Sequence, residues 1–132
     1  MNPTKTITIC DKEVKLLYCA AAETGFESMS GKPSDIFSPH RGKDAEGNDT
    51  ILPPEATTGD WLMLAIAAII AAYAKEGKDA PIASNEILYD ASPVEITQII
   101  TAVITLRNEW YKIPEVVKEE MTPDKDKDAK NE

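Results

Sequence analysis

The first residues of the chain alternate between apolar and polar side chains, which is typical of β-strands. The alternation runs from Lys5 to Tyr18 and predicts a β-hairpin. With Asp11 and Lys12 as the loop, the expected register pairs the apolar side chains of one face, Ile9 with Val14 and Ile7 with Leu16. An isolated hairpin is only marginally stable, so we expect it to pack on helices.

The next apolar residues recur at helical spacing. Residues Cys19 to Ser30 predict a helix that ends at Gly31, with one apolar stripe made of Cys19, Ala22, Phe26 and Met29. Ser34 to Phe37 could add one short helical turn capped by Ser34. The segment Thr57-Thr58-Gly59-Asp60 then matches a capping box, the signature of a helix start.

The helix that follows this capping box is apolar on every side, from Trp61 to Ala74, and Gly77 ends it. Such a helix is normally the central one of a domain, and its many alanines let a neighbour approach closely. Ser84 is expected to cap a short helix that includes Tyr89. Ser92-Pro93-Val94-Glu95 predicts the start of a long helix to about Lys112, with these side chains facing inward: Ile96, Ile99, Ile100, Val103, Leu106 and Trp110.

These elements predict one domain over residues 1–121, with a mainly helical α+β fold. We expect the N-terminal β-hairpin (5–18) to pack on a small helical bundle of about three principal helices. Residues 38–56 contain three prolines, two glycines and little periodicity, so we expect a long, mobile loop there. Glu115 to Met121 could form a last short turn, and residues 122–132 are expected to be a disordered charged tail.

Charge and hydropathy indicate which partners and which cellular compartment to expect for this protein. The 132 residues include 23 acidic and 14 basic side chains, giving a net charge of -9, which disfavours binding to nucleic acids or anionic membranes. The longest apolar run has fourteen residues, whereas a membrane-spanning helix needs about 20. The first fifteen residues do not resemble a signal peptide, and the two cysteines, Cys10 and Cys19, do not form a disulfide framework. We therefore expect a cytoplasmic protein.

Candidate catalytic chemistry is sparse. The single histidine, His40, is expected in a solvated loop, and with two separated cysteines it cannot build a zinc site of usual spacing. Residues 44–49 resemble a calcium loop, but the glycine stands fourth where sixth is required. Residues 25–32 resemble a phosphate-binding loop, but five residues separate the glycines and Pro33 replaces the Ser or Thr. We expect no enzymatic activity and no cofactor.

Four aromatic residues are the candidates for binding a partner: Trp61, Tyr73, Trp110 and Tyr111. Trp110 and Tyr111 are adjacent, so on a helix they point about 100° apart and cannot both enter the same core. Either the second ring packs on a neighbouring loop, or it anchors a partner, since Trp and Tyr dominate binding hot spots.

The layout resembles the tail assembly chaperones of siphovirus-type bacteriophages and related prophages, over residues 5–113. The resemblance lies in the hairpin followed by the segments Tyr18–Lys32, Leu62–Tyr73, Ser92–Ile96 and Asn108–Tyr111. It implies a non-enzymatic chaperone in the bacterial host that binds the tape measure protein, a long, helical, aggregation-prone chain, and keeps it soluble during tail assembly. The tail tube protein and a second copy of this chain are further partners left open.

The family supplies no catalytic or ligand residues to carry over, and residues 38–56 have no counterpart in its pattern. The first alternative is a structural phage component, such as a tail-completion or head–tail connector protein. A small enzyme or ligand-binding protein and a host regulatory adaptor are further alternatives.

Overall fold

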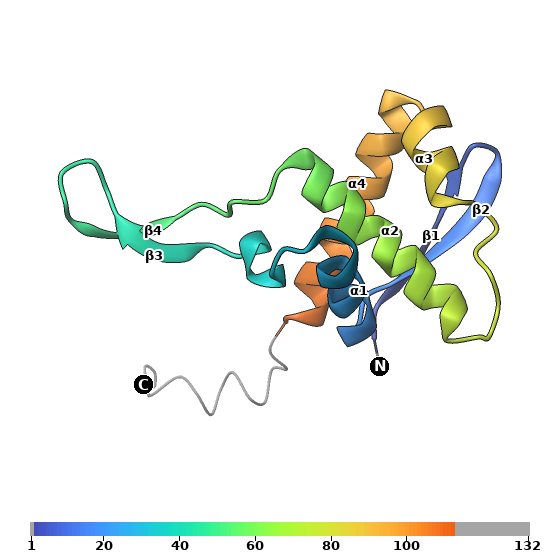
Figure 1. Cartoon of the computed structure of the whole chain (residues 1–132), viewed down its shortest axis with the longest axis horizontal. Helices are drawn as coiled ribbons and strands as arrows, with labels where there is room; N and C mark the ends of the chain where they lie inside the picture. The colour runs from blue at the N-terminus through green and yellow to red at the C-terminus, as the bar shows by residue number, and fades with distance from the viewer. Residues whose placement is uncertain (1, 113–132) are drawn as a thin grey trace, which may run out of the picture.

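The computed structural model describes residues 2–112, and over these residues the chain has an α+β fold, mainly helical, as the sequence predicts (Figure 1). The elements in chain order are β1 (Thr4–Ile9), β2 (Lys12–Leu17), α1 (Ala20–Ser30), the 3-10 turn η1 (Ser34–Phe37), β3 (His40–Lys43), β4 (Asp49–Leu52), α2 (Thr58–Ala74), α3 (Ser84–Asp90) and α4 (Pro93–Trp110). The described part thus has four α-helices, where about three principal helices were expected, and two antiparallel hairpins.

Helix α2 lies at the centre of the fold, as its uniformly apolar sequence predicts. It contacts α1, β2 and α4, and most of its side chains from Leu64 to Ala72 are buried. Small residues lie at the contact between α1 and α2. A Cβ placed on Gly25 of α1 would lie 3.5 Å from the Cβ of Ala67, so the two helix backbones approach with only small groups between them.

The N-terminal hairpin has a register that differs from the predicted one. Strand β1 pairs with β2 so that Ile7 lies opposite Val14 and Ile9 opposite Lys12, which makes Cys10 and Asp11 the loop. Both loop residues have positive φ, 50° and 65°, as a two-residue type I′ turn requires. Val14 thus lies opposite Ile7, two residues along β1 from its expected partner Ile9. Because side chains alternate between the two faces of a strand, a shift of two residues keeps the same side chains on one face, and Ile9, Val14 and Leu16 are fully buried.

Contacts from the helices favour this register of the hairpin. The backbone N–H of Cys10 donates to Glu95 Oε2 at the start of α4, at 2.7 Å. Lys12 Nζ lies 3.0 Å from Glu86 Oε2 of α3. A loop at residues 11–12 would change the orientation of both groups, so long-range bonds outweigh the local pattern that the sequence displays.

The starts of α2 and α4 follow the predicted signals, and those of η1 and α3 do not; η1 begins after Pro33 and not after the predicted cap Ser34. Thr57 with Asp60 and Ser92 with Glu95 form complete capping boxes at α2 and α4. Helix α3 begins after Ala83 and not after the predicted cap Ser84; Glu86 accepts from the Ala83 N–H and takes the role of cap.

Residues 38–56 are not the long loop that the sequence predicted; they contain a second hairpin, β3–β4, which projects from the body as an arm (Figure 1). Its turn is a three-residue loop in which Gly47 has φ 85°, while Asp44 Oδ1 accepts from two following N–H groups. A Cβ on Gly42 of β3 would overlap Leu52 Cδ1, so a larger residue there would displace the Leu52 side chain. The strands have four residues each and little apolar alternation, which is why periodicity misses them.

Two smaller expectations differ from the structure. Met29, placed on the apolar stripe of α1, is exposed on the last turn, so this stripe contributes Ala22 and Phe26 to the core. Ile96, Ile100 and Trp110 are half-buried, whereas Ile99, Val103 and Leu106 are buried as predicted. The short turn at 115–121 and the charged tail at 122–132 lie outside the described residues.

Asp60 provides a test of these capping contacts. The Thr57 backbone N–H, together with Lys32 Nζ at 3.0 Å, lowers the pKa of the Asp60 carboxyl, although burial opposes the shift. A lowered folded-state pKa gives stability that is present above the unfolded value of about 3.9 and is lost as the pH falls through the folded value. Asp60→Asn should therefore lower the free energy of unfolding at neutral pH by about 1 kcal/mol, measured by urea denaturation. This difference should shrink in acid.

The matched control is Asp79→Asn, which changes an exposed carboxylate that accepts no hydrogen bond within the described residues. Equal losses of stability in the two variants, or a loss at Asp60 that does not depend on pH, would contradict the assigned role.

Candidate functional site

Three of the four predicted partner-binding residues belong to one cluster around Arg107. The ring of Trp61 packs on Phe37 with centroids 4.5 Å apart. The Arg107 guanidinium carbon lies 5.9 Å from the centroid of Phe37 and 4.6 Å from that of Tyr111. Arg107 therefore lies between two aromatic rings and connects the start of α2 to the end of α4.

Trp110 and Tyr111 continue this cluster towards the N-terminus. Trp110 is half-buried, packs 5.4 Å from Tyr18, and donates from Nε1 to Asn2 Oδ1 at 3.1 Å. The hydroxyls of Tyr18 and Tyr111 both donate to Glu23 Oε2 at 2.7 Å. Burial first, and then these bonds to a carboxylate, raise the pKa of both tyrosines. Tyr111 remains 51% exposed, so it alone of this group presents a large surface to a partner.

The fourth residue, Tyr73, lies at the other end of α2. Its hydroxyl accepts from the backbone N–H of Lys15 on β2 at 3.0 Å. The structure therefore does not bring all four residues together on one surface. Each of the three residues Trp61, Tyr73 and Trp110 makes contacts within the domain, and their binding of a partner stays a prediction.

Arg107 itself is buried, with 8% exposure, and nothing in the sequence pattern indicates its role. One guanidinium nitrogen donates to Ser38 Oγ at 2.6 Å, and this bond fixes the chain just before the arm. Its Nε–H has no partner within the described residues, and no carboxylate there lies within ion-pair distance. A buried cation without an anion is costly, and the bond to Ser38 and the two aromatic contacts offset part of this cost.

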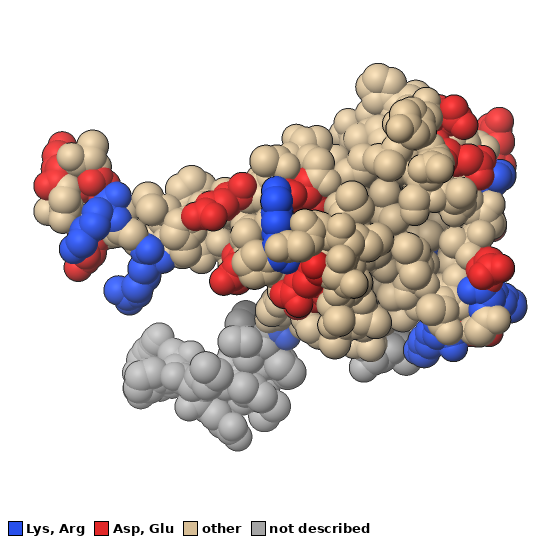
Figure 2. Space-filling model, in the orientation of Figure 1, with Lys and Arg blue, Asp and Glu red and all other residues tan. Residues whose placement is uncertain are grey.

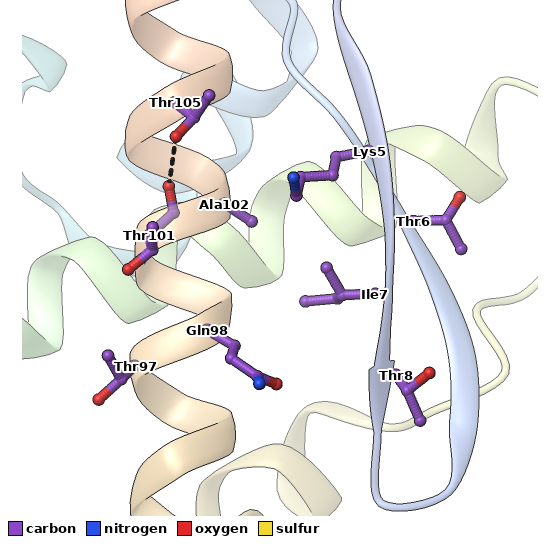
Figure 3. A pocket seen from close by; sticks show the side chains of 9 residues that line it. All are labelled: Lys5, Thr6, Ile7, Thr8, Thr97, Gln98, Thr101, Ala102 and Thr105. Carbon is purple, nitrogen blue, oxygen red and sulfur yellow. Dashed lines mark hydrogen bonds between the residues drawn. The ribbon is translucent and has the colours of Figure 1, made fainter.

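A groove of about 580 Å³ lies between β1 and α4 (Figure 3). Its lining is mainly threonine, with Lys5 as the only charged member: Lys5, Thr6, Ile7, Thr8, Thr97, Gln98, Thr101, Ala102 and Thr105. Figure 3 shows Lys5 and Ile7 pointing towards α4, whereas Thr6 and Thr8 point the other way. On α4 the hydroxyl of Thr105 donates to the Thr101 carbonyl at 2.9 Å, so this hydrogen is directed to the helix backbone.

The β1 side of this groove is an unpaired strand edge. Tyr18 N–H donates to the Pro3 carbonyl, which identifies Pro3 and Tyr18 as a hydrogen-bonded pair. Bonded and non-bonded pairs alternate in antiparallel strands, so Thr4, Thr6 and Thr8 direct their N–H and C=O groups outward. None of these outward groups has a hydrogen-bond partner within residues 2–112. The opposite edge of the hairpin differs, since Lys15 N–H there is bonded to Tyr73.

Besides the Arg107 cluster and the groove between β1 and α4, a third surface is formed by exposed apolar side chains of α3 and the first turn of α4. Tyr89 is 83% exposed, and Leu88 and Val94 are exposed as well. Only Ile87 of α3 is buried. We call Leu88, Tyr89 and Val94 the α3 surface. The sequence predicts a short helix that includes Tyr89 but assigns no role to Tyr89 or Leu88. Three consecutive large apolar residues, Ile87 to Tyr89, cannot all be buried by one short helix, and this is the signal that could have identified them.

Charged groups do not form a single acidic face on the visible side of the molecule. In Figure 2 the carboxylates and basic groups lie on the arm and at the margins of the body, and much of the body surface between them is uncharged. His40, at the base of the arm, lies 3.5 Å from Glu55 Oε2. Over the part of the chain that the structure describes, no three His, Cys, Asp or Glu side chains group as a metal site would require.

Comparison with known proteins gave no relative. No protein-family model matches the chain, and searches of curated proteins and of solved structures found no significant match. Among the helices described, none has the length and apolar character needed to cross a membrane.

The Arg107 guanidinium has no anionic partner among the described residues, and this predicts how variants of Arg107 behave. Arg107→Met keeps most of the aliphatic volume and removes the uncompensated charge, so the free energy of unfolding should change by less than about 1 kcal/mol. Arg107→Ala removes the stem between Phe37 and Tyr111 and should cost about 2–4 kcal/mol. Chemical denaturation of the two variants measures both values. A large loss in Arg107→Met would instead assign the stability to the charge and its bond to Ser38.

Proposed function

We propose that this chain is a non-enzymatic tail assembly chaperone of a long-tailed bacteriophage or prophage, which binds the tape measure protein in the host cytoplasm and keeps it soluble. The observation that supports this most directly is the α3 surface, where Leu88, Tyr89 and Val94 are exposed on a chain of net charge -9. The resemblance in element order supplies the identity of the partner.

The α3 surface has the chemistry that recognises an apolar helix. Tyrosine is among the side chains that dominate binding hot spots, and Leu88 and Val94 add apolar area on either side of it in the sequence. An amphipathic client helix could pack its apolar stripe here while its polar face remains in water. The excess of negative charge would oppose aggregation of the complex.

A structural component of the phage tail is the second candidate. The projecting β3–β4 arm favours it, because an arm that extends away from the body is suited to contact with a neighbour in an assembled particle. Tail-completion and head–tail connector proteins would both be found in purified particles.

Co-expression tests the proposal. The client is the longest protein encoded downstream in the same gene cluster, and affinity capture of this chain should recover that protein in the soluble fraction. Tyr89→Asp combined with Leu88→Asp should reduce the recovered client by at least tenfold, since two charges would be placed against its apolar stripe.

Thr24→Asp with Ser28→Asp is the matched control, because it adds the same two charges at exposed positions of α1. Should the client stay insoluble with the unaltered chain, and should this chain be detected in purified particles, the structural alternative replaces the chaperone. If both double variants recover the client equally, the binding surface lies elsewhere.

A further inference from the structure

The β3–β4 arm makes few contacts with the rest of the molecule. It projects from one end of the long axis of the molecule, and Ile51 on it is 62% exposed (Figure 1). A two-stranded hairpin without a covering layer is marginally stable, so an arm of this kind gains most from contact with another surface.

Both edges of the arm are open within the described residues. Asp44 N–H donates to the Asn48 carbonyl, which makes residues 44 and 48 a bonded pair; by alternation Gly42 and Thr50 are bonded, and Arg41 and Ile51 are not. Arg41 and Ile51 thus direct their N–H and C=O groups outward, on the β3 edge and the β4 edge respectively. These backbone groups remain without a protein partner in the described part of the chain.

The groove beside β1 lies in the other half of the molecule, as Figure 1 shows for β1 and the arm. An arm cannot reach the groove of its own copy across this distance, but it can reach that of a second copy. We propose that copies of this chain associate head to tail, with β4 of one arm pairing with the open edge of β1 in the next copy. The contact joins different surfaces of the two copies, so repetition yields a ring or a filament.

Three features favour β4 as the inserted strand. Its residues Ile51 and Leu52 are apolar and suit a partly covered site, whereas β3 contributes Arg41 and Lys43. At the tip of the arm, Asp49 is paired with Lys43, whereas Asp44 and Glu46 form no ion pair within the described residues. Lys5 is the only charged residue lining the groove, so these two carboxylates and the groove are complementary in charge. The threonines of α4 leave room for a strand, which bulkier side chains would fill.

The inference goes beyond the proposed function and is independent of it, since no client is required. Sedimentation velocity of the pure, full chain over a concentration series tests it. We expect the mass of the unaltered chain to rise from one copy to several as the concentration increases. A single copy at every concentration, up to the millimolar range, would overturn the proposal.

Proline variants identify the strand edges. Thr8→Pro and Ile51→Pro each remove one outward N–H without breaking a bond within either hairpin, and each variant should sediment as one copy. Glu13→Pro and Arg41→Pro are their matched controls, because they alter the opposite edges of the same hairpins at equivalent non-bonded pairs. The controls should associate as the unaltered chain does, and equal loss of association in the controls would contradict the assigned edges.

Mixing Thr8→Pro with Ile51→Pro gives the most decisive test. Thr8→Pro retains its arm and Ile51→Pro retains its β1 edge, so an equimolar mixture should form a complex of two copies and nothing larger. Failure of the mixture to associate would reject this arm-to-edge contact. Circular dichroism checks that each variant is folded; if Thr8→Pro is not, Thr101→Trp fills the groove from α4 and serves in its place.

Discussion

Burial of the apolar helix α2, where every side chain from Leu64 to Ala72 except Ile70 is buried, is the constraint on which the rest of the structure depends. No single neighbour can cover a helix that is apolar on every side, and the fold uses α1, β2 and α4 together. The first two come before α2 in the sequence and the third comes after it, so the core forms only when both ends of the chain have packed. Small residues at the contact with α1, such as Gly25 and Ala67, set how closely this packing proceeds.

Carboxylates at the third position of the helices connect this core to the outer elements. Asp60, Glu86 and Glu95 each accept from a backbone N–H at the start of their own helix, and each also reaches a separate segment: Lys32, Lys12 and the N–H of Cys10. The same side chain therefore satisfies a helix terminus and fixes a long-range contact. At Glu95 the second bond positions the tip of the β1–β2 hairpin against α4, and so defines one end of the groove between β1 and α4.

The helices could be predicted because their signals lie within a few residues of each other in the sequence. The hairpin register and the arm could not, because they depend on contacts between distant segments or lack an apolar pattern. Capping boxes and apolar spacing located α2 and α4 closely, because these signals act within a few residues. The hairpin register depends on Glu86 and Glu95, far along the chain, and could not be read from the strands alone. The arm has too few apolar residues to show alternation. Trp61 and Trp110 are candidate binding residues because Trp and Tyr dominate binding hot spots, but large aromatic rings serve core packing equally well, and the sequence does not separate the two roles. The open edge of β1 is evident only from the structure, where Tyr73 bonds to the opposite edge of the hairpin.

The base of the arm determines how its far end can move. Glu55 N–H and Ala56 N–H both donate to the carbonyl of Ile36, and the neighbouring Phe37 is buried beside Phe26. Both strands of the arm are thus attached to the body at one short segment around Ile36. A small rotation at this segment displaces the tip of the arm by a larger distance than its base. For an arm held by a neighbouring molecule, the angle between the two bodies, and hence the curvature of the assembly, would be set here, by the bonds to the Ile36 carbonyl and by the bond from Arg107 to Ser38.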